Sequence, residues 1–177
     1  MRALNSGSGR HLVVEDEAIV ATDIQDRLCA MGYHAAGWAE STQQALAMVE
    51  ARRPDLVLMD IRLQGARDGI RAAEEIGRRF RIPIVFLTAY SEEATLERAK
   101  QTEPFGYILK PFNDRELKST IEIALYKHKT ESTIRRLSRL LDVLGQVNQA
   151  IVRIQIREEL LPAICRLVVE RGAVEMA

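Results

Sequence analysis

The sequence predicts an α/β fold: a doubly wound, five-stranded parallel sheet followed by a C-terminal helical extension. Two observations support this prediction. Short apolar segments alternate along the chain with longer segments in which apolar residues recur every three or four positions, as strands alternating with helices do. The clearest strand, residues 56–59, is apolar throughout, which is typical of a parallel strand covered by helices on both faces.

The five expected strands are short. They cover residues 11–14, 33–39, 56–59, 84–87 and 105–109. Parallel strands need crossover connections, so a helix is expected after each strand, and right-handed crossovers place these helices on both faces of the sheet. In such sheets, ligands bind beyond the carboxyl ends of the strands.

Turn residues mark the first two expected helices. The first helix carries four apolar residues on one face: Val20, Ile24, Leu28 and Met31. It is expected to end at Gly32. The second helix begins at the cap Ser41, where Gln44 completes a capping box, and it ends before Pro54.

Similar signals mark the other three helices. The third follows the turn at Asp68, and the fourth begins at the cap Ser91. Apolar residues at helical spacing define the buried face of the third: Ile70, Ala73, Ile76 and Phe80. The fifth begins at the cap Asn113, with Phe112 placed to pack against Leu117.

The composition is that of a globular protein without charge bias. The 177 residues are 47% hydrophobic and 28% charged, and 25 basic residues balance 25 acidic ones. This balance argues against a nucleic-acid or membrane surface. No apolar stretch is long enough to span a membrane, and the first residues lack the apolar centre of a signal peptide. A cytoplasmic location is therefore expected.

Three segments are expected along the chain. Residues 1–9 read as a flexible leader, residues 10–129 as the α/β domain, and residues 130–177 as the helical extension. Cys29 and Cys165 lie far apart within apolar helical patterns. We expect both to be small buried residues in a reducing compartment rather than partners in a disulfide.

Charged and polar residues stand where four of the strands end. Glu15 and Asp16 follow the first strand, Asp60 the third, Thr88 the fourth and Lys110 the fifth. Because the carboxyl ends of parallel strands meet at one edge of a sheet, we expect these side chains to lie together. Each alone has a simpler interpretation, as a helix cap, a strand-end residue or a solvated terminus. Together on one edge they indicate a site.

The residue types of this cluster suit phosphoryl transfer. Three carboxylates repel one another unless a cation neutralises them. A cluster without His or Cys favours Mg²⁺, which prefers oxygen ligands and keeps several waters. Lys110 offers a positive charge and Thr88 a hydroxyl donor to phosphoryl oxygens. The expected product is an aspartyl phosphate at Asp60.

Four motifs carry a resemblance to a known family. They are Val13-Val-Glu-Asp-Glu17, Leu58-Met-Asp60, Phe86-Leu-Thr-Ala89 and Tyr107-Ile-Leu-Lys-Pro-Phe112. In this order and spacing, over about residues 10–129, they resemble the receiver domain of two-component response regulators. The resemblance implies a flavodoxin-like fold with strand order 2-1-3-4-5.

The resemblance also implies roles for individual residues. Asp60 is the implied phosphoacceptor. The implied metal ligands are Glu15, Asp16, Asp60 and the backbone carbonyl of Arg62. The implied contacts to the phosphoryl group are Lys110, Thr88 and the backbone of Ala89. Thr88 and Tyr107 form the implied switch pair, and the Lys110–Pro111 peptide bond is implied to be cis. Glu15 stands where the family more commonly has Asp.

Beyond residue 129 the helical pattern continues without a breaker. Its seam alternates in steps of three and four residues: Ile134, Leu137, Leu141, Leu144, Asn148 and Ile151. Leu140, Val147 and Ile154 widen this seam. The pattern fits homodimerisation or a small bundle, and equally a helix packed on its own α/β domain. Asn148 would fix the register of a coiled coil.

A second helix is expected over residues 157–171, ended by Gly172. Residues 144–151 and 164–172 resemble the opening helices of a GAF sensory domain. The sheet that would complete a GAF ligand pocket is not part of this sequence.

The leading functional interpretation is a phosphorylation-controlled switch. It would take a phosphoryl group from a sensor histidine kinase or phosphotransfer protein and relay the change through its last helix, catalysing only its own phosphorylation and dephosphorylation. One alternative is a receiver-controlled, antiterminator-like nucleic-acid regulator, disfavoured because the basic cluster Arg135, Arg136 and Arg139 is short. Another is an interaction module that is not phosphorylated. A haloacid-dehalogenase-like phosphatase would need an Asp where Arg62 stands.

Overall fold

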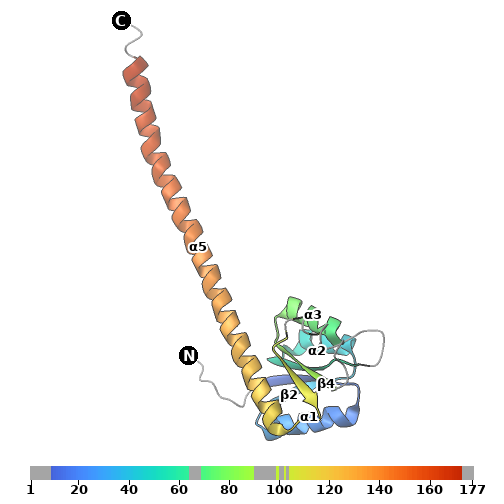
Figure 1. The fold of residues 1–177 in the computed structure, drawn as a ribbon. Coiled ribbons are helices and arrows are strands. Elements are labelled where there is room, and N and C mark those ends of the chain that lie inside the picture. The colour runs from blue at the N-terminus through green and yellow to red at the C-terminus, as the bar shows by residue number, and fades with distance from the viewer. Residues whose placement is uncertain (1–8, 64–68, 90–98, 100–101, 103, 173–177) are drawn as a thin grey trace. The chain divides into compact units, whose positions relative to one another are not determined.

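The computed structural model describes residues 9–63, 69–89, 99, 102 and 104–172, with side chains described as far as residue 149. The chain forms two compact units, residues 1–130 and 131–177. In the first, helices cover both faces of a parallel sheet (Figure 1). The sheet has five strands in the order β2-β1-β3-β4-β5, which confirms the predicted fold class and strand order.

The strands lie within a residue or two of the predicted segments. They are β1 (Arg10–Val14), β2 (His34–Ala39), β3 (Leu56–Asp60), β4 (Ile84–Ala89) and β5 (Gly106–Lys110). The helices are α1 (Ala18–Ala30), α2 (Thr42–Arg52), α3 (Gly69–Phe80) and α5 (Asp114–Gly172). The helix expected to begin at Ser91 falls outside the described residues.

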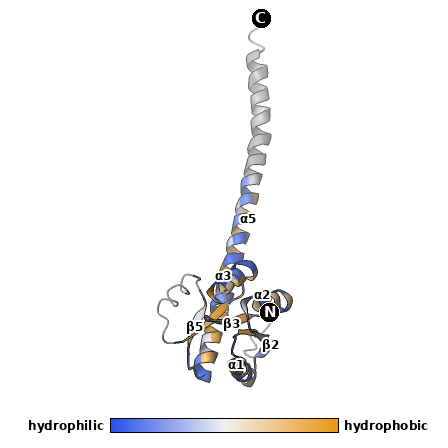
Figure 2. Ribbon diagram, turned by 90° about the vertical axis from the view of Figure 1, so that its right-hand side faces the viewer, coloured by the Kyte–Doolittle hydropathy of each residue, from blue (hydrophilic) through white to orange (hydrophobic). Residues whose placement is uncertain are grey.

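The sheet separates two apolar cores. Helices α2 and α3 pack on one face, and α1 with the start of α5 packs on the other. Every residue of β3 is buried, as the unbroken apolar run predicts for a central strand. Figure 2 shows hydrophobic colouring on the strands, whereas the helices around them carry both hydrophilic and hydrophobic residues. This enclosure leaves the ends of the strands as the place where polar side chains gather.

The predicted caps form with one variation. The Ser41 hydroxyl accepts from the Gln44 N–H at 3.3 Å. The Gln44 side chain accepts from the N–H of Glu40 at 2.9 Å, one residue earlier than a capping box requires. The Asn113 side chain accepts from the Glu116 N–H at 2.9 Å, so it caps α5 as predicted. Gly32, just after α1, has a φ of 88°, a conformation that favours glycine.

Two expectations are wrong. Cys29 is exposed, because it lies one residue past the buried stripe of α1 (Ala21, Ile24 and Leu28) and so points about 100° away from it. The expected second helix over residues 157–171 is instead part of one continuous helix, α5. Residues 152–161 contain no Gly, Pro, Asn, Asp or Ser, so nothing in that stretch favours a turn. Cys165 lies where side chains are not described.

Candidate functional site

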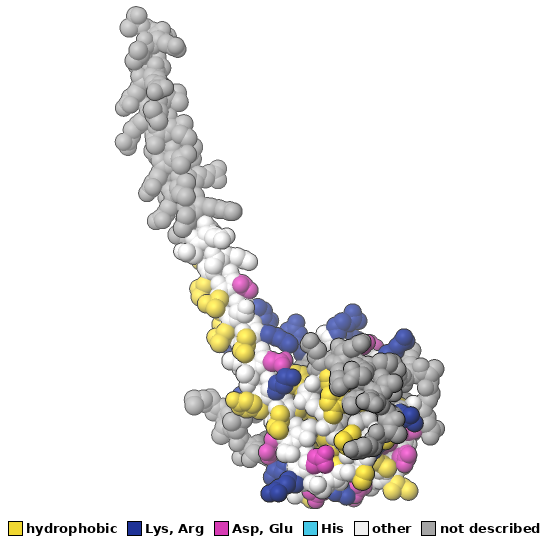
Figure 3. All heavy atoms as spheres, viewed as in Figure 1, with side chains coloured by type: hydrophobic (Ala, Val, Ile, Leu, Met, Phe, Trp, Pro, Cys, Tyr) yellow, Lys and Arg dark blue, Asp and Glu magenta, His cyan; other side chains and the backbone are white. Residues whose placement is uncertain are grey.

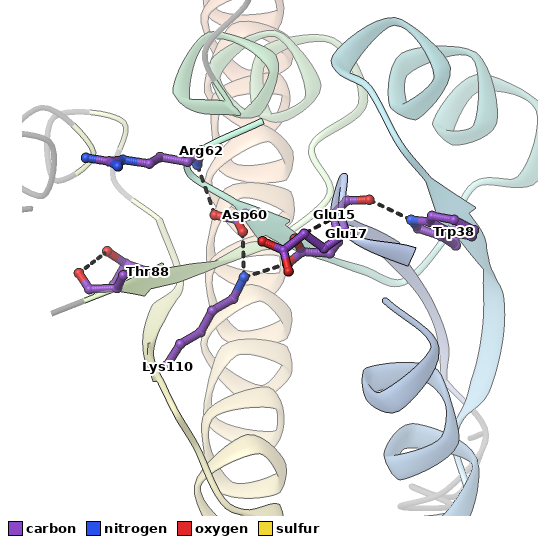
Figure 4. A network of polar contacts seen from close by, with 8 residues as sticks. Glu15, Glu17, Trp38, Asp60, Arg62, Thr88 and Lys110 are labelled. Carbon is purple, nitrogen blue, oxygen red and sulfur yellow. Dashed lines mark hydrogen bonds and ion pairs between the residues drawn. The ribbon is translucent and has the colours of Figure 1, made fainter. Parts of the chain in front are cut away.

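The predicted site residues lie at the carboxyl edge of the sheet. Parallel pairing aligns Asp60 in β3 with Leu87 in β4, and Ala89 in β4 with Lys110 in β5. Glu15 directly follows β1, which pairs with β3. The register therefore brings together side chains from segments far apart in the sequence, as expected for a doubly wound sheet. Figure 4 shows this network.

Three carboxylates form a cluster that could hold a metal ion. Glu15, Asp16 and Asp60 each offer an oxygen, and these oxygens all lie within 4.8 Å of one another. Glu15 is 1% exposed and Asp60 8% exposed, while Asp16 is half-buried. An all-oxygen donor set suits a hard cation such as Mg²⁺ better than zinc. The cluster brings together the three acids of the ligand set that the resemblance implies.

Lys110 bridges two of the carboxylates. Its Nζ donates to Glu15 Oε2 at 2.6 Å and to Asp60 Oδ2 at 2.5 Å. These are charge-assisted hydrogen bonds in a mostly buried setting, where they are stronger than at the surface. Lys110 thus already neutralises part of the negative charge of the cluster.

Burial and mutual interaction change the ionisation of this pair. Burial raises the pKa of Glu15 to about 7, the hydrogen bond from Lys110 opposes that rise, and the charge of Asp60 adds to it. Burial lowers the pKa of Lys110, but its hydrogen bonds to Asp60 and Glu15 outweigh burial, so the net shift of that pKa is upward. Lys110 is therefore charged at neutral pH. Glu15 is only partly ionised there, so a second cation nearby would favour its charged form.

Asp60 is held through both of its oxygens. Oδ1 accepts from the backbone N–H of Arg62 at 2.9 Å, while Oδ2 accepts from Lys110. The Arg62 side chain extends away from Asp60 (Figure 4). The backbone N–H of Arg62 is therefore in contact with Asp60, while the metal-ligand role of its carbonyl stays a prediction.

The two residues of the predicted switch pair lie on neighbouring strands. Thr88 is 2% exposed, and its hydroxyl donates to the carbonyl of Ala89 at 3.3 Å. The Tyr107 ring stacks on Phe86, with 6.0 Å between ring centroids, and its hydroxyl is buried. Thr88 thus stands beside the network of Lys110 and the carboxylates (Figure 4). The Lys110–Pro111 peptide bond is cis, as the resemblance implied.

Two further residues support the site, and no motif linked them to it. The Trp38 indole N–H donates to the backbone carbonyl of Glu15 at 2.6 Å, which ties the segment carrying the acids to β2. A Cβ on Gly69 would lie 2.2 Å from the backbone carbonyl oxygen of Asp60. Only glycine fits that close approach, so the start of α3 packs directly against the end of β3. A turn signal at residues 68–69 was the one sequence sign of this contact.

Comparison with known proteins agrees with the resemblance found in the sequence. A model of the family described as "Response regulator receiver domain" matches residues 12–122. The transcriptional regulatory protein PdtaR of Mycobacterium tuberculosis is 37% identical over 145 residues, which cover 80% of this chain and 70% of PdtaR. The phyllosphere-induced regulator PhyR of Methylorubrum extorquens is 31% identical over 116 residues, covering 65% of this chain and 43% of PhyR.

Solved structures show the same likeness. The signal receiver domain of a modulated diguanylate cyclase from Desulfovibrio desulfuricans matches with a TM-score of 0.66 and 35% identity. That match covers 70% of this chain and 98% of the other. The expected likeness of residues 144–151 and 164–172 to a GAF domain lies outside the segment that the family model matches and stays a prediction. Among the described residues, no helix combines the length and apolarity needed to cross a membrane.

Proposed function

The chain belongs to the response regulator receiver domain family, and we propose that it is a phosphoacceptor switch. Asp60 takes a phosphoryl group from a sensor histidine kinase or a phosphotransfer protein. The observation that carries this proposal is the setting of the Asp60 carboxylate, held at the carboxyl edge of the sheet among two other acids and Lys110.

In this proposal the acids hold Mg²⁺ and Asp60 is the nucleophile. Glu15, Asp16, Asp60 and the backbone carbonyl of Arg62 would be its protein ligands, and the ion would supply charge neutralisation for an anionic phosphodonor. An Asp60 oxygen forms the new bond to phosphorus, and the donor leaves with the electrons of the bond that breaks. The product is an aspartyl phosphate.

The other site residues receive the transferred group. The Lys110 ammonium, which bridges Glu15 and Asp60, offers its charge to a phosphoryl oxygen. The Thr88 hydroxyl and the Ala89 N–H donate to the others. In this proposal the phosphoryl group attracts the Thr88 hydroxyl, which then no longer donates to the Ala89 carbonyl. Tyr107 in the neighbouring strand β5 changes its position in turn, as the second member of the switch pair. Helix α5, which directly follows β5 in the chain, relays the change, and we propose that it also joins two copies of the chain.

This proposal is tested by intact-mass measurement after incubation with Mg²⁺ and acetyl phosphate. Wild type is expected to gain one phosphoryl group, and Asp60→Asn none. Asp26→Asn, an exposed acid on α1, is the control and should behave as wild type. Asp16→Asn should gain the group only at much higher Mg²⁺ concentration, because it removes a proposed metal ligand. An adduct on Asp60→Asn equal to that on wild type would overturn the proposal.

A second candidate function is control of transcription through nucleic acid. The match to the transcriptional regulator PdtaR covers 80% of this chain, more than residues 12–122, so it includes part of α5 beyond the receiver. Arg135, Arg136 and Arg139 are exposed on that helix. If these arginines bind phosphates, replacing all three with Ala should weaken RNA or DNA binding and reduce its salt dependence. Binding that is equal in both proteins would exclude these arginines as the interface.

A further inference from the structure

Helix α5 presents a continuous apolar face within the second unit. Six apolar side chains of this face are each 50–67% exposed: Ile134, Leu137, Leu140, Leu141, Leu144 and Val147. Figure 3 shows hydrophobic side chains along this part of the helix. An exposed apolar patch of this kind marks an interaction surface. The question is which partner it fits.

The spacing of the face is that of a coiled coil. With Ile134 at heptad position a, Leu141 is the next a, and Leu137 and Leu144 occupy the two d positions. In the first heptad, Ile134 at a with Leu137 at d is the combination that favours two parallel strands. Asn148 falls at the following a position, where a single asparagine fixes register and oligomeric state. Binding to a lipid surface does not require apolar residues to repeat every 3.5 residues, whereas packing against a second helix in a coiled coil does.

The residues at heptad positions e and g, which flank the seam, have sizes that suit packing against a second copy of the chain. Leu140 occupies g, and Ser138 and Gly145 occupy the two e positions. In a parallel, in-register pair, each g residue faces the e residue five positions later on the other chain, so Leu140 meets Gly145 of the second copy. A Cβ at Gly145 would meet no atom within 4 Å, so packing within the described chain does not require glycine there. Glycine in a helix interior is otherwise unfavourable.

The flanking positions also match by charge. From residue 134 to residue 148, no a, d, e or g position carries a charge. The charged residues of this stretch, Arg135, Arg136, Arg139 and Asp142, all fall at b, c or f. Two copies can therefore approach in register without like charges meeting.

We propose that residues 134–148 form a parallel, two-stranded, in-register coiled coil with a second copy of this chain. The heptad carries the apolar seam, Asn148 sets the register, and each Leu140 packs against the space beside Gly145 of the other copy. This association does not depend on phosphorylation of Asp60, so it is measured on the full chain without phosphodonor. Its failure would leave the proposed phosphoryl transfer untouched.

The first test is the molar mass of the full chain by sedimentation equilibrium over a range of concentrations. Wild type is expected to show twice the 20.0 kDa of the chain. Leu144→Asp, at a d position, should lose the dimer. Val143→Asp is the matched control because Val143 is 56% exposed but sits at position c, and it should remain dimeric. A monomeric wild type, a larger oligomer, or a dimer that persists in Leu144→Asp would overturn the proposal.

The second test concerns orientation. In a chain whose Cys29 and Cys165 are replaced by Ser, Leu144→Cys places one thiol on the seam, and Gln146→Cys places one at position f on the opposite side. Under mild oxidation, Leu144→Cys should form a disulfide-linked dimer and Gln146→Cys should not, because equivalent d residues meet only in a parallel pair. Equal cross-linking of the two variants, or none with Leu144→Cys, would overturn the parallel, in-register arrangement.

Discussion

Lys110 is the residue on which the charge balance of the site depends. It is the ammonium that lies within hydrogen-bonding distance of both Glu15 and Asp60. Glu15 is almost fully buried, and a buried carboxylate without a charged partner protonates rather than stay ionised. Lys110 therefore favours the ionised form of Glu15, in addition to its proposed contact with the phosphoryl group.

Replacing Lys110 with Met is expected to slow phosphorylation by acetyl phosphate by about 100-fold, the usual effect of removing one group that stabilises developing charge. The pKa of Glu15 should also rise further, because the hydrogen bond that opposes its rise is lost. The initial rate of adduct formation, followed by intact mass, measures this. Lys118→Met, an exposed lysine on α5, should keep the wild-type rate. Equal rates in the two variants would show that Lys110 has no part in the transfer.

His11 is the second residue whose ionisation the fold changes. It is 0% exposed, its ring lies 4.5 Å from that of Tyr33, and neither ring nitrogen has a hydrogen-bond partner among the described residues. Burial lowers the pKa of His11 to about 4, and the charge of Asp55 only partly offsets this. The His11 imidazole is therefore neutral in the folded chain at neutral pH.

The folded protein should lose stability as the pH falls from about 6.5 to about 4. Over that range the unfolded chain binds a proton at His11 and the folded chain does not, so protons favour unfolding. Between pH 7 and pH 4.5, wild type should lose about 2 to 3 kcal/mol more than His11→Leu. Urea unfolding at both pH values measures the difference. His34→Gln, which removes an exposed histidine, should follow wild type, and a loss in His11→Leu as large as in wild type would contradict the account.

At the scale of elements, the junction of β3 and α3 determines where Asp60 lies. Gly69, the first residue of α3, approaches the backbone of Asp60 more closely than any side chain permits. Gly77 lies in the same helix, and a Cβ there would meet nothing within 4 Å. The two glycines therefore differ in environment while sharing a helix.

Substituting these glycines should change stability in opposite directions. Gly69→Ala forces the backbone of β3 or α3 to move, and it should lower the free energy of unfolding by about 1–3 kcal/mol and slow phosphorylation of Asp60. Gly77→Ala should raise that free energy by about 0.5–1 kcal/mol, because alanine is the better helix former. Urea unfolding of both variants gives the comparison. A Gly69→Ala protein as stable as Gly77→Ala would mean that the contact is not tight.

At the scale of the whole molecule, periodicity and the ends of the strands were enough to predict the sheet and the cluster. The apolar run before Asp60 is typical of a strand covered on both faces, and parallel strands bring their carboxyl ends to one edge of the sheet. That geometry predicts Glu15, Asp60 and Lys110 side by side, and Lys110 contacts both acids in the structure.

Other features depend on tertiary contacts that leave no local pattern. The hydrogen bond from Trp38 in β2 to the Glu15 carbonyl, just after β1, depends on the register between these two strands. The exposure of Cys29 depends on a rotation of one residue around α1. The single helix α5 runs through both expected helices, because residues 152–161 contain no residue that favours a turn.

Tandem mass spectrometry of peptides locates the phosphoryl group and so tests whether Asp60 is the phosphoacceptor. After incubation with Mg²⁺ and acetyl phosphate, the phosphoryl group should be found on the peptide that contains Asp60, at that residue. Finding it on Asp16, on a histidine or elsewhere while Asp60 remains unmodified would contradict the account.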